Sequence, residues 1–483
     1  MKISPKTAIL LGDRSRAKKS SSASVRAAVC ALTLLVAPPL SVVQAELPEL
    51  GNSSANDREL AELGREAMLS AGQRNPTLSD VELHDYLSSL MQTLSGANGL
   101  DELDIQLTLF ADRSVNAFAL PGGYIGVFAG LVLSATSESA LVSVMAHELA
   151  HLSQRHIHRF MQRQSQASLA AMAAVIAAAL VMRDNPDAAQ ATIYSGLASA
   201  NQSLLDYSRA HEREADRTGQ RLMSNAGFRP EGMAEMFEGL ALKEQLNQGQ
   251  GLEYLQTHPV TQSRIADAWE SARSFKVKGS DDAIGFALVQ ARFATLVGAP
   301  ITGAARPYGL ALKALQNREP AKAEVAFEQL PEPLAEHRLA RLLRARVLAA
   351  NGNLPTALKL LQEVKTDYPG WYPASHTQAE LLGDDGQFQA AADETSDFLR
   401  LNGSHWPLTY RRLSVYYDQA DDTVNALRWR AEHHAQKRNY AAAASLFEQA
   451  LKHAEQDSAI ATRSHSRLEQ IQERALQERP SRR

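Results

Sequence analysis

Cysteine is almost absent from this chain of 483 residues, which contains only Cys30. That residue lies in an N-terminal segment that we expect to be removed, so the remaining chain would hold no cysteine at all. Disulfide bonds, thiolate metal sites and a cysteine nucleophile are therefore excluded from it.

The N-terminal segment has the features of a secretory signal peptide. Seven basic residues are followed by an apolar run from Ala27 to Val36 and by the small-residue cleavage pattern Val43-Gln44-Ala45. We therefore predict a signal peptide over residues 1–45. A membrane anchor is the alternative, but the apolar run is short and ends at Pro38-Pro39.

The rest of the chain lacks an apolar run that could cross a bilayer, which takes about 18 residues or more. The uninterrupted run from Leu169 to Met182 has 14. We interpret residues 169–205 as a helical hairpin that turns at 183–186. This hairpin could form a lid over a cleft, a peripheral membrane contact or part of the core. The sequence favours a lid or membrane contact about as much as it favours a place in the core.

An excess of basic residues is missing as well. The net charge is −4, and removal of residues 1–45 takes away seven basic residues and one acidic residue, which leaves −10. An acidic chain without a basic stripe repels phosphate backbones, so binding to nucleic acid is disfavoured. The roughly 438 residues that remain are enough for two domains.

The most informative motif present is His147-Glu148-Leu149-Ala150-His151. Residues four apart share one face of a helix, so the two imidazoles can bind one metal ion while Glu148 acts on a water molecule at that ion. Residues 141–146 are largely apolar and lack Gly and Pro, as a buried helix requires. A chance match on a surface helix is the alternative.

Two further segments could complete such a site. Glu212 and Asp216 lie one turn apart at the start of a helical run, so Glu212 can reach the metal while Asp216 accepts a hydrogen bond from a ligand histidine. Taken alone, this acidic cluster would be a solvated helix start. Farther along, Pro259 restricts the backbone beside His258, and Arg264 lies where the next helix begins.

The ordered patterns H-E-x-x-H, E-x-x-A-D and H-P-x-x-x-x-R resemble those of the M48 family of zinc metallopeptidases. The chain is most similar to the periplasmic branch of that family, which joins the peptidase to a C-terminal tetratricopeptide array. The resemblance implies one Zn²⁺ per chain, whose ligands would be His147, His151 and Glu212.

The resemblance also assigns roles to the other motif residues. Glu148 would be the general base and Asp216 the hydrogen-bond partner of a ligand histidine. His258 and Arg264 would lie near the scissile carbonyl, and one of them would stabilise the oxyanion together with the metal. His258 could instead take the open coordination position and hold the enzyme latent, which is a hypothesis.

A substrate strand is expected upstream of the metal motif. Two β-prone stretches within residues 115–128 flank the turn Pro121-Gly122-Gly123. The resemblance makes this hairpin the edge strand above the zinc cleft, where an extended peptide can add as a further strand. We therefore expect loose sequence specificity and extended or unfolded substrates. A structural hairpin without substrate contact is the alternative.

The C-terminal half shows an internal repeat. Ala323, Ala357 and Ala391 are each 34 residues apart, and turn residues recur in step with them. A 34-residue period of helix pairs is typical of tetratricopeptide repeats, whose stacked array usually binds a protein segment. We expect about four repeats, with an uncertain register after Asp418.

These patterns predict an α+β zincin-like metallopeptidase domain, mostly helical with a small sheet, followed by an all-α tetratricopeptide solenoid. The expected boundaries are 46–280 for the peptidase, 281–306 for a linker and 307–483 for the repeats.

The predicted function is that of a periplasmic zinc endopeptidase in quality control and assembly of outer-membrane proteins. Its substrates would be misfolded or stalled outer-membrane proteins, and the array would dock substrate or the β-barrel assembly machinery. These substrate and partner expectations rest on the resemblance alone. The alternative is a chaperone or adaptor in which the array promotes assembly and the metal site is mostly latent.

Overall fold

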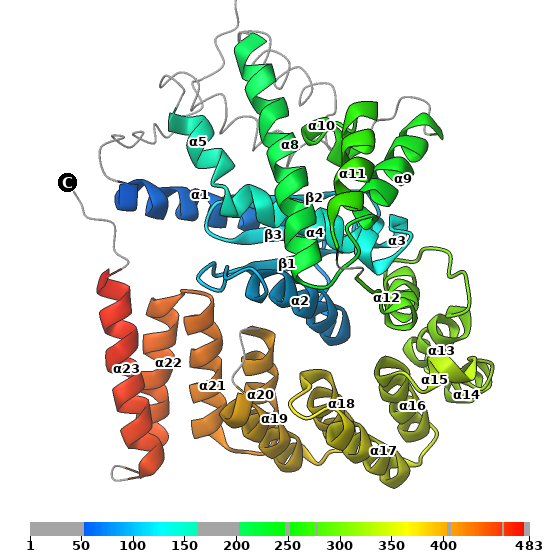
Figure 1. The fold of residues 1–483 in the computed structure, drawn as a ribbon. Helices are drawn as coiled ribbons and strands as arrows, with labels where there is room; N and C mark the ends of the chain where they lie inside the picture. The colour runs from blue at the N-terminus through cyan, green and yellow to red at the C-terminus, as the bar shows by residue number, and fades with distance from the viewer. Residues whose placement is uncertain are drawn as a thin grey trace, which may run out of the picture. The chain divides into compact units, whose positions relative to one another are not determined.

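A small sheet and one buried helix form the centre of the N-terminal half (Figure 1). The computed structural model describes residues 53–162, 202–246, 252–276, 279–402, 407–455 and 458–477. The predicted signal peptide and the apolar hairpin, apart from residues 202–205, lie outside these ranges. Among the helices that are described, none is both long enough and apolar enough to cross a membrane.

The sheet has three strands in the order β1-β3-β2. Its strands are β1 (Gln106–Phe110), β2 (Ala117–Leu120) and β3 (Tyr124–Phe128). β1 runs parallel to β3 with Gln106 opposite Tyr124, and β2 runs antiparallel to β3 with Leu120 opposite Tyr124. Gly122 and Gly123 take φ values of 88° and 86° in the connecting turn, a backbone conformation that glycine adopts without strain. The predicted hairpin is thus formed, and β2 is its edge strand.

The N-terminal half has ten described helices, of which α4 is central and buried by others. They are α1 (Ser53–Arg74), α2 (Val81–Gly96), α3 (Ala129–Ser134), α4 (Glu138–Ser153), α5 (His156–Gln162), α8 (Gln202–Asn225), α9 (Gly232–Leu246), α10 (Glu253–Thr257), α11 (Gln262–Ser274) and α12 (Ala283–Leu296). Ser137 caps the start of α4 by accepting a hydrogen bond from the Ala140 N–H. Every residue of α4 from Glu138 to Ala150 is buried, because α8 and α9 pack against it.

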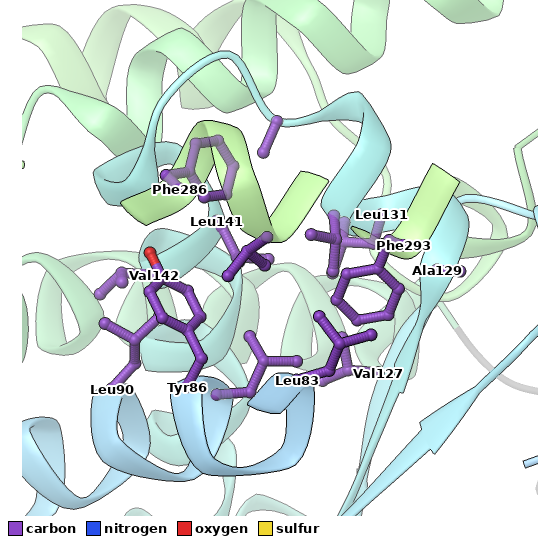
Figure 2. Close-up of a cluster of buried hydrophobic side chains, with 14 of the residues drawn as sticks. Leu83, Tyr86, Leu90, Val127, Ala129, Leu131, Leu141, Val142, Phe286 and Phe293 are labelled. Carbon is purple, nitrogen blue, oxygen red and sulfur yellow. The ribbon is translucent and has the colours of Figure 1, made fainter. Parts of the chain in front are cut away.

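One hydrophobic core joins α4 to the sheet and to α2, α3 and α12 (Figure 2). Leu83 of α2, Leu131 of α3 and Leu141 of α4 are completely buried in it. Burial of such a side chain contributes about 1.5–3 kcal/mol to the stability of the fold. This core holds α4 rigidly, and α4 carries the metal motif.

Residues 281–306, predicted as the linker, contain α12, whose residues Phe286, Leu288 and Phe293 are buried. The segment is therefore a packed helix followed by a loop. Residues 48–483 form one compact unit, and the division into domains at 280 and 306 stays a prediction.

The C-terminal half consists of antiparallel helix pairs. Its helices are α13 (Arg306–Gln316), α14 (Pro320–Phe327), α15 (Glu332–Ala335), α16 (Arg338–Ala350), α17 (Leu354–Asp367), α18 (Tyr372–Asp384), α19 (Phe388–Asn402), α20 (Pro407–Gln419), α21 (Thr423–Gln436), α22 (Tyr440–His453) and α23 (Ala459–Gln477). The periodic residues Ala323, Ala357 and Ala391 are completely buried in the second helix of their pairs. The predicted fold class is confirmed: a mostly helical domain with a small sheet precedes an all-α array.

We expected about four repeats with an uncertain register after Asp418, and the described residues contain five helix pairs: α13/α14, α16/α17, α18/α19, α20/α21 and α22/α23. The turn of α20/α21 lies in the interval whose register was uncertain. Gly352 and Gly386 mark the turns of the two preceding pairs with φ values of 85° and 81°, whereas Asp421 takes φ 59° at the matching position. Aspartate tolerates this left-handed conformation, so the turn forms without the expected glycine.

A buried ionic network links α2 to the array. Glu82 of α2 is 2% exposed and accepts hydrogen bonds from Arg292 of α12 at 2.6 Å and from Arg346 of α16 at 2.5 Å. Burial alone would raise the pKa of Glu82, but the two guanidinium groups outweigh it and lower that pKa to about 2. Glu82 is thus shared by two arginines, each of which also pairs with a second carboxylate, Asp80 for Arg292 and Glu380 for Arg346.

Glu82→Gln is expected to lower the free energy of unfolding by about 1.5–3 kcal/mol, because two buried guanidinium groups each lose one charged acceptor and keep a second carboxylate. The pKa of Glu82 lies below its ordinary value of 4.5 in the folded protein, so its stabilisation is complete above pH 4.5 and is lost as the pH falls towards 2. Urea unfolding at pH 7 and at decreasing pH measures both effects.

The matched control is Glu62→Gln, which removes a carboxylate from the exposed pair with Arg65. This change should cost less than about 1 kcal/mol. Equal effects of the two substitutions would contradict the central role of Glu82.

Candidate metal centre

Two imidazoles on α4 point at each other. His147 Nε2 and His151 Nε2 are 3.0 Å apart, and His147 is 1% exposed. Because α4 is buried, the alternative of ordinary surface histidines is excluded. Ring nitrogens that face each other in the interior require a shared partner, since buried polar atoms are rarely left without one.

Helix α8 brings two carboxylates to these imidazoles. Glu212 Oε1 lies 3.4 Å from His151 Nε2, and Glu212 Oε2 lies 3.5 Å from His147 Nε2. Asp216 Oδ1 lies 3.0 Å from the other ring nitrogen of His147, Nδ1. Gly219 permits this close packing, because a Cβ atom there would lie only 3.3 Å from the backbone nitrogen of His147.

The segment after α10 adds a third imidazole. His258 Nδ1 lies 3.0 and 3.1 Å from the two carboxylate oxygens of Glu212 and 3.2 Å from His147 Nε2. Its other ring nitrogen, Nε2, is 3.7 Å from Glu148 Oε1. His258 therefore lies between the first two histidines, Glu212 and Glu148.

Arg264 connects the two carboxylates of α8. Its guanidinium donates to both oxygens of Asp216 at 2.7 Å and to the Pro259 carbonyl at 2.7 Å, and its Nη1 lies 3.1 Å from Glu212 Oε2. The side chain is 5% exposed. Arg264 thus contacts the carboxylates of both Glu212 and Asp216. This arrangement favours a role in fixing the positions of these two side chains. Its contact with an oxyanion stays a prediction.

Burial and hydrogen bonding set the charges in this cluster. Burial would lower the pKa of His147, but hydrogen bonds with Asp216 and Glu212 raise it to about 10. Burial lowers the pKa of His151 to about 3. Burial would raise the pKa of Glu212, yet the charge of His258 and hydrogen bonds with the histidines hold it well below its ordinary value. Hydrogen bonds with His147 and Arg264 likewise outweigh burial and lower the pKa of Asp216.

The donor set fits a zinc ion. His147, His151, Glu212 and His258 each offer one ligand atom, and these atoms lie within 4.8 Å of one another. Ligand atoms about 2.0–2.1 Å from a tetrahedral zinc ion are separated by about 3.3 Å, close to the distances between the first three residues. Imidazole nitrogens combined with one carboxylate oxygen form a ligand set that catalytic zinc sites use.

Glu148 supplies a further observation. Its side chain is buried, and its Oε1 has no hydrogen-bond partner among the described residues. A buried carboxylate oxygen without a partner is costly, so it indicates a polar molecule bound at this position.

The structure brings all seven predicted site residues together: His147, Glu148, His151, Glu212, Asp216, His258 and Arg264. Their chemical roles stay predictions.

Two groups near the centre did not emerge from the sequence. Tyr254 is completely buried and stacks on His258 with ring centroids 4.9 Å apart. His156 Nδ1 lies 2.8 Å from His151 Nδ1. In the sequence, these two residues are marked only by their distance from predicted site residues. Tyr254 lies four positions before His258, and His156 lies five positions after His151.

Comparison with known proteins agrees with the motifs. Residues 80–272 match the model of Peptidase family M48, a range that includes all seven site residues. The resemblance inferred from the sequence is thereby confirmed, and that family implies a bound metal.

Similar proteins with names are described as proteases or metalloendopeptidases. The beta-barrel assembly-enhancing protease of Escherichia coli K12 is 30% identical over 272 residues, or 55% of each chain, and a Vibrio cholerae protein provisionally given that name is 36% identical over 234 residues, or 48% of each chain. The mitochondrial metalloendopeptidase OMA1 of Schizosaccharomyces pombe is 30% identical over 199 residues, 41% of this chain and 56% of the relative. The chain thus matches about half the length of these relatives.

Asp216→Asn is expected to weaken zinc binding by about 10–100-fold, because the amide cannot hold the His147 ring as firmly as the carboxylate does. Competition with a chromophoric chelator measures the affinity. Asp267→Asn changes an exposed carboxylate on α11 and should leave the affinity unchanged. Equal affinities of all three proteins would show that Asp216 does not support the metal.

Proposed function

We propose that this chain is a zinc-dependent endopeptidase. The observation that carries the proposal is the convergence of His147, His151 and Glu212 beside Glu148, whose buried Oε1 has no hydrogen-bond partner among the described residues. The M48 match over residues 80–272 supports the same activity. His147, His151 and Glu212 would hold the ion.

Zinc, when bound, supplies a Lewis acid that polarises a peptide carbonyl and lowers the pKa of water. Glu148 would accept a proton from the attacking water and pass it to the departing amine, as a general base and then a general acid. Asp216 would keep one proton of His147 on Nδ1, and Nε2 would lose its proton when zinc binds and present its lone pair to the ion. Arg264 would hold Glu212 and Asp216 in place, while His258 is the candidate for oxyanion contact.

The edge strand β2 is the proposed substrate-binding element. It packs on α4, and within the part of the chain that the structure describes it pairs on one side only, with β3. An extended peptide could add to its other side through backbone hydrogen bonds, which read little sequence. Two residues before β2, the Val115 carbonyl accepts a hydrogen bond from the Tyr254 N–H at 3.2 Å. The strand is thus connected to the segment that carries His258.

We also propose where the protease acts. The names of the Escherichia coli and Vibrio cholerae relatives refer to β-barrel assembly, which supports misfolded or stalled outer-membrane proteins as substrates. The helix pairs of the array would dock these substrates or the β-barrel assembly machinery. Removal of a signal peptide over residues 1–45 would place the protein in the periplasm, and residues 169–205 would provide a peripheral membrane contact or a lid.

Glu148→Gln should reduce casein digestion by about 10²–10⁴-fold, because the amide cannot accept the proton. Zinc content should stay at one ion per chain, since Glu148 is not a proposed ligand. Glu244→Gln changes an exposed residue of α9 and serves as the matched control. Undiminished digestion by Glu148→Gln would refute the enzyme proposal.

The same variant separates the protease from the chaperone alternative. If Glu148→Gln still assists outer-membrane protein assembly while degradation stops, the array has an activity of its own. If assembly and degradation stop together, the assistance depends on proteolysis.

His258→Ala tests latency. His258 Nδ1 lies within hydrogen-bonding distance of both Glu212 oxygens and 3.2 Å from His147 Nε2, so the ring occupies space that a substrate carbonyl or water would need. If His258 holds the enzyme latent, its removal should raise casein digestion while three zinc ligands remain. If His258 contacts the oxyanion instead, its removal should lower digestion. Unchanged zinc content together with unchanged digestion would end the latency hypothesis.

A further inference from the structure

A sharp chain reversal puts a fourth histidine beside the metal centre. Helix α4 ends at Ser153 and α5 begins at His156, and Arg155 between them takes φ 52°, in the left-handed region. The reversal brings His156 back against the ligand His151, with ring centroids 4.7 Å apart. His156 is 3% exposed.

The contact between these two rings has a defined direction. His151 Nδ1 and His156 Nδ1 are 2.8 Å apart, so one nitrogen must donate a proton and the other must accept it. His151 directs Nε2 to His147 and Glu212, and a metal ligand must present a lone pair there. Its proton is then on Nδ1, which makes His151 the donor and His156 Nδ1 the acceptor.

We propose that His156 is a positioning residue that fixes the tautomer and ring direction of the zinc ligand His151. This inference rests on the proposed function. Asp216 performs the equivalent task for His147 through a contact of 3.0 Å. Each ligand histidine of α4 therefore has a hydrogen-bond partner at Nδ1, a carboxylate for His147 and a neutral imidazole for His151.

In this tautomer the proton of His156 is on Nε2. That atom has no hydrogen-bond partner among the described residues, and it faces the negatively charged Glu214 Oε2 at 3.5 Å. Arg159 donates to the same oxygen at 2.7 Å and holds the carboxylate there. The His211 ring stacks on His156 with centroids 4.2 Å apart and planes 7° from parallel, which restricts rotation of the His156 ring.

His156, His211 and Glu214 could also be read as a second metal site, since each offers a ligand atom. Two features disfavour that reading. Imidazole lone pairs lie in the ring plane, and two stacked, nearly parallel rings cannot direct theirs to one ion. The Arg159 guanidinium on Glu214 also adds positive charge where a cation would bind.

His156→Leu and His156→Asn separate positioning from packing. In full-length protein, the leucine removes the acceptor, and we expect zinc affinity to fall by about 10–100-fold. The asparagine places its Oδ1 where Nδ1 was and should restore most of the affinity. His158→Leu, on the same helix α5, is the control and should bind zinc like the wild type.

Two measurements give readouts besides proteolysis. Competition with a chromophoric chelator gives zinc affinity and stoichiometry. Visible absorption of the cobalt-substituted proteins should show a changed ligand geometry in His156→Leu and a wild-type spectrum in His156→Asn and His158→Leu. If His156→Leu fails to fold, the comparison of His156→Asn with the wild type still decides, because a large loss of affinity there contradicts the acceptor role.

The outcomes distinguish the two proposals. One zinc ion per wild-type chain, with affinity and spectrum unchanged in His156→Leu, would overturn the positioning role alone. Two ions per wild-type chain and one in His156→Leu would establish the second metal site in its place. A wild-type chain without zinc would overturn the proposed function and the positioning role with it.

Discussion

The close packing of α8 against α4 is the constraint on which the site depends. It brings Glu212 to within 3.5 Å of imidazoles that precede it by more than 60 residues in the chain. Burying this carboxylate and Asp216 is costly, because both lose their hydration. Arg264 offsets that cost by contacting both. Neither carboxylate would be stable if it were buried without a partner. A divalent cation would balance the negative charge that Arg264 leaves uncompensated.

The metal helix is also anchored at its other end. Tyr86 of α2 donates to Glu138 in the first turn of α4 at 2.5 Å, and α2 contacts the repeat array through Glu82 and through Asp85, which accepts a hydrogen bond from Trp371 at 2.8 Å. Helix α2 therefore touches both the metal helix and the array.

Motifs made the metal centre predictable, since spacing within a helix fixes which side chains share a face. The 34-residue period likewise predicted the array, but its register became uncertain after Asp418, where Asp421 takes φ 59° in place of the glycine of the two preceding turns. Arg264 contacts two carboxylates of a distant segment, and His156 reaches His151 because Arg155 takes a left-handed conformation. Neither arrangement leaves a periodic pattern in the sequence.

Zinc analysis of the purified wild type beside Glu212→Gln tests the central claim most directly, since Glu212 is the ligand contributed by α8. Inductively coupled plasma mass spectrometry should find one zinc ion per wild-type chain, and dialysis against a weak chelator should strip Glu212→Gln first. A wild type free of zinc after purification without chelators, or a Glu212→Gln protein that retains the ion equally well, would contradict the account.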